Sequence, residues 1–308
     1  MSTVLMSAGL KPNTHRTYNS AQNRYLNFCC LYDLVATPTT EDVLLLYVAF
    51  LFDDNLKGSS IRVYLAAVRS LHVFWGLPYP VETLRLRLAV KGAITQSPPP
   101  VRKLPITFDV LCSMLHCMTD RFDFKMLSAA MTLAFFGCFR SGEICVVNQS
   151  LFDCKVNLCM EDVLVDREQR MLSIFLKKSK NDYVSKGVSV FVGCSKKKVC
   201  GYCSVVEYID SLSCHAILPT APFFRDAMGL PLSKDYFVSA TRLSLALAGH
   251  DPMLFSGHSF RAGAATTAGD QGFDDWEIKM LGRWNSSAYS IYLRNPKVVS
   301  TFASRLAI

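Results

Sequence analysis

Two neighbouring stretches near the C-terminus carry most of the information in this sequence: GHSFRAGAATTAG (residues 257–269) and LGRWNSSAYSIYLRNP (residues 281–296). In the first, His258 and Arg261 stand three residues apart at the expected start of a helix, so both side chains project from one face. The start of a helix also presents backbone amides to an anion. The alanines and glycines that follow allow close packing against neighbouring helices. The second stretch contains two tyrosines one helical turn apart, Tyr289 and Tyr292.

A further basic residue stands well upstream, in FGCFRSGEI (residues 136–144). We expect a buried helix to break at Gly137 and to restart after Ser141, which leaves Arg140 at the break. A buried arginine is costly unless it faces a ligand or an acid, and Glu143 is placed to orient it. An internal ion pair between Arg140 and Glu143 is the alternative interpretation.

Between these regions lies LKKSKNDYVSKGVSV (residues 176–190), a lysine-rich turn between two strand-like runs. Lys177, Lys178, Lys180 and Lys186 are its basic residues. A solvated turn would explain them, and so would contact with a polyanion.

Cleavage of a DNA strand by a protein tyrosine has three chemical requirements. The phenol must lose its proton, the extra negative charge on phosphorus must be held, and the departing 5′ oxygen must receive a proton. Guanidinium suits the second task because it stays charged and donates two parallel hydrogen bonds to phosphate oxygens. Arg140 and Arg261 are therefore the candidate phosphate ligands.

The order of these groups resembles the tyrosine recombinase (integrase) family, over roughly residues 10–296. That resemblance implies a catalytic set of Arg140, Lys180, His258, Arg261, Trp284 and Tyr292. It implies that Lys180 protonates the leaving 5′ oxygen, with Lys177, Lys178 and Lys186 as rivals. It also implies that His258 assists proton transfer or orients the phosphate.

Tyr292 is the expected nucleophile, because Tyr292-Leu-Arg-Asn matches the family's Tyr-Ile-Arg-Asn; Tyr289 is the rival. The family's late His or Trp stands nine residues before the tyrosine, and that position is Arg283 here. Trp284 lies eight before it, within a Gly-Arg-Trp form that resembles recombinases of eukaryotic mobile elements (DIRS-like and Ngaro-like retroelements and Cryptons). We assign the phosphate-contacting indole to Trp284, with a core tryptophan as the alternative.

Composition is compatible with a nucleic-acid partner. Half of the 308 residues are hydrophobic, and the net charge is +8. Eight basic residues and one acid fall between Arg170 and Lys198. Such clustering favours a polyanion, although a solvated hairpin would also show it.

The twelve cysteines are interpreted as reduced thiols, because no signal peptide is recognised and most lie in apolar runs. Cys194, Cys200 and Cys203, with Cys214-His215, raise the possibility of zinc. Since only one Cys-x-x-Cys is present, we favour small apolar residues near a strand end. The longest apolar run, 43–52, is too short to span a bilayer.

The pattern of elements predicts a mainly α protein with a small antiparallel sheet. Residues 1–94 are expected to form a basic domain of amphipathic helices. The first helix covers about 12–34, with Asn13 or Thr14 as its cap. The second starts at Thr40, the third starts at Ser59 or Ser60, and the fourth covers 81–93. In the third, Trp75 is expected on the apolar face, and Arg62 and Arg69 on the other as DNA contacts. Residues 95–105, with three consecutive prolines, form a linker. The catalytic domain is 106–308, with helices from Thr107 or Asp109 and over 124–136, and strands at 161–165, 171–176 and 188–192.

We therefore expect a helical core-binding domain and an α+β tyrosine recombinase catalytic domain that together clamp double-stranded DNA. The reaction passes through a 3′-phosphotyrosyl intermediate and needs no metal or nucleotide cofactor. The resemblance implies a homotetramer on two DNA sites with the C-terminal tail exchanged in trans, a mobile-element origin and a nuclear location. The alternatives are a domesticated non-catalytic DNA-binding protein and a type IB topoisomerase-like strand transferase.

Overall fold

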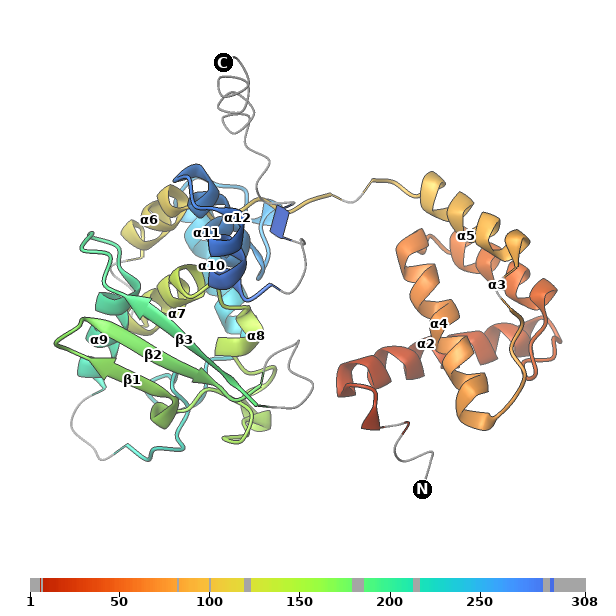
Figure 1. The fold of residues 1–308 in the computed structure, drawn as a ribbon, viewed down its shortest axis with the longest axis horizontal. Helices are drawn as coiled ribbons and strands as arrows, with labels where there is room; N and C mark the ends of the chain where they lie inside the picture. Colours follow the sequence, from red (N-terminus) through yellow and green to blue (C-terminus); the bar gives the residue numbers. More distant parts are fainter. Residues whose placement is uncertain are drawn as a thin grey trace, which may run out of the picture. The chain divides into compact units, whose positions relative to one another are not determined.

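The structure is a computed structural model that describes residues 6–284 and 289–290, apart from residues 7, 82, 100, 119–122, 179–185 and 213–216. The chain forms two compact units, Met1–Val101 and Arg102–Ile308 (Figure 1). The division falls within the segment 95–105 that the prolines mark as a linker. No helix among the described residues is both long and apolar enough to cross a membrane.

The first unit consists of helices that enclose one apolar core. They are α2 (Pro12–Leu31), α3 (Glu41–Asp53), α4 (Gly58–Trp75) and α5 (Leu84–Gln96). Aromatic and aliphatic side chains at helical spacing fill the centre, and Tyr25, Leu44, Tyr47, Leu51 and Ile61 are fully buried. The hydroxyl of Thr40 accepts a hydrogen bond from the backbone N–H of Val43 and caps α3, as the sequence predicts.

Three details of this unit differ from the predictions. Helix α2 begins at Pro12 after Lys11, and not after Asn13 or Thr14, because the fixed φ of proline suits the first helical position. Trp75, expected on the buried face of α4, is 74% exposed, since it lies in the last turn just before Gly76. Helix α5 continues to Gln96, past the expected end of the domain, and stops only where Pro98 forces Ser97 into an extended conformation.

The second unit is mostly helical around a single core. Its helices are α6 (Phe108–His116), α7 (Phe124–Phe136), α8 (Ser141–Ile144), α9 (Gly201–Ser211), α10 (Lys234–Leu247), α11 (Ser259–Asp270) and α12 (Asp275–Gly282), with 3₁₀ turns at Gln149–Leu151, Met160–Asp162 and Pro252–Leu254. Helix α7 is buried along almost its whole length, as its uniformly apolar sequence predicts. It ends before Gly137, and α8 begins after Arg140, so the predicted helix break is confirmed.

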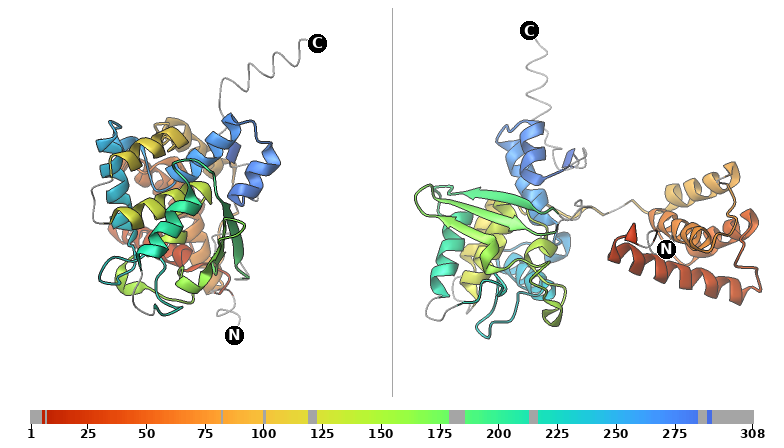
Figure 2. Two further views of the ribbon diagram at one scale, coloured as in Figure 1. Left: turned by 90° about the vertical axis from the view of Figure 1, so that its left-hand side faces the viewer. Right: turned by 60° about the horizontal axis from the view of Figure 1, so that its bottom comes forward.

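One small antiparallel sheet lies beside these helices (Figures 1 and 2). Its strands are β1 (Val163–Asp166), β2 (Met171–Leu176) and β3 (Val188–Gly193), in the order β1-β2-β3. Inward-facing Leu172 pairs with Val192 across β2 and β3, and both are buried in the core of the unit. The lysine-rich segment lies in the sequence between β2 and β3.

Helix α11 reaches the centre of the unit because its side chains are small. A β-carbon at Gly263 would stand only 1.7 Å from the carbonyl oxygen of Ile106. The backbone N–H of Ile106 donates to the carbonyl of Ser259 at 2.9 Å, so the chain crosses the helix in direct contact. This close approach fixes the start of α11, where His258 and Arg261 are located.

Candidate active site

Arg140 lies at the break between α7 and α8, with a buried acid beside it. Its backbone N–H donates to one oxygen of Glu143 at 2.9 Å, and its Nη1 donates to the other at 2.7 Å. The Glu143 side chain is only 6% exposed, and the Arg140 side chain 19%. The predicted pair therefore exists, and it holds the guanidinium in one orientation at the edge of the core.

The same carboxylate holds a second arginine from far along the chain. Arg283 follows α12 in a left-handed conformation, with φ of +53°. Its Nη2 donates to Glu143 at 3.2 Å, and its guanidinium also donates to the carbonyls of Gly137 at 2.8 Å and Cys138 at 3.2 Å. Arg283 thus connects the end of α12 to the break after α7.

Arg261 is the most deeply buried cation of the group, at 4% exposure. It projects from the first turn of α11 and donates to the carbonyls of Cys138 and Gly282. Its guanidinium carbon stands 4.3 Å from the centroid of the Trp284 ring, within the range of a cation–π contact. These contacts bring α11, the turn after α7 and the end of α12 together at one point.

Trp284 is packed between this arginine and a buried tyrosine. The centroids of its ring and the Tyr289 ring are 5.9 Å apart. Close packing requires a glycine nearby, because a β-carbon at Gly282 would stand 1.6 Å from the indole ring. Tyr289 is 3% exposed in a small cluster with Ala265, Ala268 and Ile278.

His258 precedes Ser259, the first residue of α11, and is exposed. Its backbone N–H donates to the hydroxyl of Ser256 at 3.3 Å. The predicted placement of His258 and Arg261 at the start of one helix is therefore confirmed. The imidazole reaches solvent while the guanidinium turns into the protein.

The charges in this cluster do not balance. Arg140, Arg261 and Arg283 bring three positive charges, and Glu143 brings one negative charge. Burial, followed by the positive charges of Arg140 and Arg283, lowers the pKa of Arg261 to about 10. Burial also lowers the pKa of Arg283. A guanidinium remains charged at neutral pH even so, and a site with this excess of positive charge favours an anion.

The donors suit a tetrahedral anion better than a metal. Guanidinium groups donate paired hydrogen bonds to phosphate oxygens, whereas a cation would meet repulsion here. Among the described residues, the ligand atoms of His, Cys, Asp and Glu converge in a group of three or more only at Cys194, Cys200 and Cys203, away from this cluster in sequence. The other two residues of the zinc alternative, Cys214 and His215, lie outside the described residues.

Two of the expected catalytic residues, Lys180 and Tyr292, lie outside the described residues. Of the other lysines in the turn, Lys178 is exposed. Lys177 is held within the protein, because its ammonium donates to Asp162 at 2.6 Å and to the carbonyl of Cys154 at 2.8 Å.

Arg62 and Arg69, expected to contact DNA, are both exposed on α4 of the first unit. Sequence reasoning missed the contact of Arg283 with Glu143. The only signal was its place at the late family position, nine residues before Tyr292.

Comparisons with known proteins were made for sequence and for fold. No protein-family model matches the sequence. The integrase/recombinase XerD homolog of Selenomonas ruminantium is 24% identical over 299 residues, which cover 89% of this chain and 79% of the relative. This similarity to a recombinase extends over most of the chain and agrees with the order of the residues described above.

Two solved integrase structures are similar to this chain in fold. A λ integrase (75–356) dimer bound to a COC′ core site has a TM-score of 0.61 and 18% identity, with 95% of this chain and 92% of that one covered. The Tn1549 transposon integrase (82–397) in complex with circular intermediate DNA has a TM-score of 0.62 and 13% identity, with coverage of 96% and 94%. The expected mainly α fold with a small antiparallel sheet is confirmed.

Proposed function

We propose that this protein is a site-specific recombinase that cuts and rejoins DNA strands through a 3′-phosphotyrosyl intermediate. The observation that carries the proposal is the buried cluster of three guanidinium groups around a single carboxylate. Such a cluster stabilises an anion, and its preformed donors would hold the charge that develops on phosphorus during strand transfer. The related λ integrase and Tn1549 integrase structures contain DNA, which supports double-stranded DNA as the substrate.

Within the site, Arg140 and Arg261 are proposed to bind the non-bridging oxygens of the scissile phosphate. Glu143 orients Arg140, and it is itself positioned by Arg283. Arg283 already donates to three internal acceptors. This supports Trp284 as the residue whose indole N–H contacts the phosphate. His258, exposed at the start of α11, assists proton transfer or orients the phosphate.

Tyr292 is proposed as the nucleophile. The burial of Tyr289, the alternative nucleophile, supports this choice, because Tyr289 is only 3% exposed among alanine, isoleucine and tryptophan side chains. Burial, and then a hydrogen bond with the Asp275 carboxylate, raise the pKa of Tyr289. A raised pKa disfavours the phenolate that attacks phosphorus.

Lys180 is proposed as the general acid for the 5′ oxygen. The pairing of Lys177 with Asp162, whose side chain is 4% exposed, supports the choice of Lys180 over Lys177. Separating Lys177 from Asp162 to reach DNA would leave a carboxylate buried without its cation, which is costly.

The first unit is proposed to be the core-binding domain, with Arg62 and Arg69 on the exposed face of α4 against the DNA backbone. We place the boundary between the domains in the segment 97–105, after the end of α5 at Gln96. The resemblance to tyrosine recombinases also underlies three finer proposals: a eukaryotic mobile-element origin, action in the nucleus, and a homotetramer on two DNA sites with the tail after Tyr292 exchanged in trans.

A nicked duplex tests the reaction directly. A duplex that the protein selects from a randomised DNA pool is rebuilt with a nick, so that the cleaved end diffuses away and the intermediate accumulates. We expect the wild-type protein to form an adduct with DNA that resists denaturation. We expect Tyr292→Phe to bind the same duplex and form none. Tight binding by the wild type without any adduct would overturn the proposal in favour of a non-catalytic DNA-binding protein.

A further inference from the structure

Three cysteines converge where the sheet meets α9. Cys194 directly follows β3, Cys200 immediately precedes α9, and Cys203 lies in its first turn. The sulfur of Cys194 is 3.7 Å from that of Cys200 and 3.8 Å from that of Cys203, and all three sulfurs lie within 4.8 Å of one another. All three are free thiols.

Two of these three separations match the dimensions of a zinc–thiolate site. With Zn–S bonds of about 2.3 Å and tetrahedral angles, two sulfur ligands stand about 3.8 Å apart. The sulfurs therefore lie close to three corners of a zinc tetrahedron. The backbone that carries them is short and turns sharply: only the five residues 195–199 separate Cys194 from Cys200, and Lys196 adopts a left-handed conformation, with φ of +55°.

The backbone also contacts this cluster. The N–H of Ser195 donates to the sulfur of Cys200 at 3.2 Å. Hydrogen bonds of this kind orient the ligands of metal sites.

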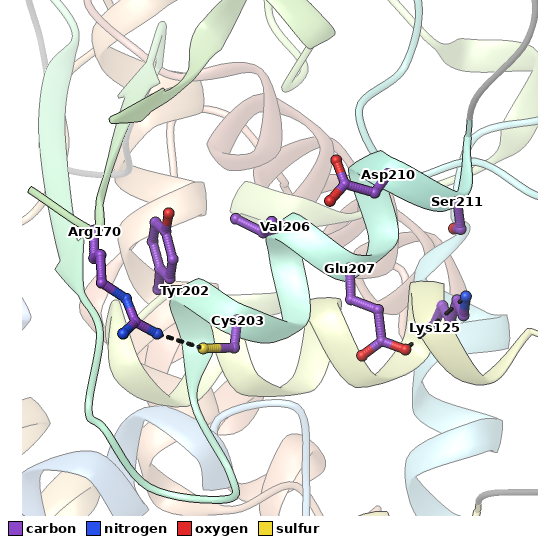
Figure 3. Close-up of a pocket in the computed structure, with 8 residues that line it drawn as sticks. All are labelled: Lys125, Arg170, Tyr202, Cys203, Val206, Glu207, Asp210 and Ser211. Carbon is purple, nitrogen blue, oxygen red and sulfur yellow. Dashed lines mark hydrogen bonds and ion pairs between the residues drawn. The ribbon is translucent and has the colours of Figure 1, made fainter. Parts of the chain in front are cut away.

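Basic side chains also lie near the three cysteines. Arg170, from the turn between β1 and β2, donates from Nη2 to the sulfur of Cys203 at 3.8 Å (Figure 3). Lys196, Lys197 and Lys198 are exposed in the loop that joins Cys194 to Cys200. A divalent ion bound by three thiolates carries a net charge of −1, which Arg170 and the lysines would balance. Such outer partners commonly tune metal sites.

We propose that Cys194, Cys200 and Cys203 form a binding site for a thiophilic divalent metal of the zinc class, with solvent in the fourth position. The ion would join the end of β3 to the start of α9, and α9 packs on the buried helix α7. It would thereby stiffen the base of the β2–β3 hairpin. The inference does not rest on the proposed strand transfer.

Cobalt(II) provides the most direct probe, because tetrahedral cobalt–thiolate sites absorb strongly in the visible and near ultraviolet. The full-length protein, purified under reducing conditions, is titrated with Co²⁺ and the bound Co²⁺ is then displaced with Zn²⁺. We expect one equivalent of Co²⁺ to produce the tetrahedral spectrum and one equivalent of Zn²⁺ to remove it. Absence of the spectrum in folded protein overturns the proposal, and so does a disulfide among the three cysteines in the reduced preparation.

Single substitutions test which side chains bind the metal. Cys203→Ser should weaken Zn²⁺ binding at least a hundredfold, since loss of an outer-shell partner alone weakens metal affinity about 10–100-fold. Arg170→Ala tests that outer shell, with about a tenfold loss expected. Cys117→Ser, at an exposed thiol at the end of α6, is the matched control and should bind like the wild type.

Thermal unfolding, monitored by circular dichroism, separates a loss of metal binding from a failure to fold. Zn²⁺ should raise the Tm of the wild type and of Cys117→Ser but leave that of Cys203→Ser unchanged. An equal rise in Cys203→Ser would place the metal elsewhere and overturn the assignment.

Discussion

Replacing Glu143 by Gln tests the charge arrangement of the candidate site. The carboxylate accepts hydrogen bonds from Arg140 at 2.7 and 2.9 Å and from Arg283 at 3.2 Å, and its side chain is 6% exposed. Loss of its charge leaves three guanidinium groups together without an anion. Breaking a buried ion pair costs about 3–5 kcal/mol. Because the two arginine side chains are 17–19% exposed, we take the lower end, about 3 kcal/mol.

Urea unfolding of the full-length protein measures this loss. With a denaturant slope of about 3 kcal/mol per molar urea, the upper end of the range for small proteins, 3 kcal/mol corresponds to a fall of about 1 M in the midpoint. The fall should appear in the transition of the second unit, which contains Trp276 and Trp284. Glu168→Gln, at an exposed acid of the same unit, is the control and should change stability by less than about 0.5 kcal/mol. Equal midpoints for the two variants would show that Glu143 does not hold the arginines together.

Four further outcomes follow from the proposed mechanism. Arg261→Ala should lower the cleavage rate by about 100–1,000-fold, as removal of an oxyanion donor does, and should weaken duplex binding far less; normal cleavage in a single-turnover assay would make Arg261 structural. The defect of Lys180→Ala should be rescued by a substrate with a 5′-bridging sulfur, because a thiolate leaves without that proton; rescue of Lys178→Ala instead would move the general acid. Cleavage in buffer without divalent cations should proceed at the full rate, and a strict requirement for Mg²⁺ would contradict a guanidinium site. Removal of residues 297–308 should abolish tetramers on DNA in sedimentation while monomers still bind, and unchanged assembly would reject exchange of the tail.

Local signals in the sequence identified most elements correctly. Helices begin next to Thr40 and, of the alternatives Thr107 and Asp109, next to Thr107. Each hydroxyl caps its helix, because a side chain and the backbone three residues later are always neighbours along the chain. Strand β2 has the predicted bounds, Met171–Leu176. The spacing of His258 and Arg261 likewise depends only on helical geometry. Each of these features is decided within a few residues.

Contacts between segments that are distant in the sequence could not be predicted from local patterns. The carboxylate of Glu143 holds Arg283, 140 positions along the chain, and no periodicity or cap connects the two. The convergence of Cys203 with Cys194 depends on how β3 meets α9. Trp75 suits the apolar pattern of α4, yet its side chain is 74% exposed. Sequence alone could name candidate residues of the site and the local pair of Arg140 and Glu143, but not the contact of Glu143 with Arg283.

The central claim is that Tyr292 attacks the scissile phosphate within the arginine cluster. Peptide mapping of the covalent adduct tests it: the adduct formed on the nicked duplex is digested with protease and nuclease, and the modified peptide is sequenced by mass spectrometry. The account predicts a nucleotide joined through its 3′ phosphate to Tyr292, with Tyr289→Phe giving the same adduct. A 3′-phosphotyrosyl bond at Tyr289, or a linkage through a 5′ phosphate, would contradict it.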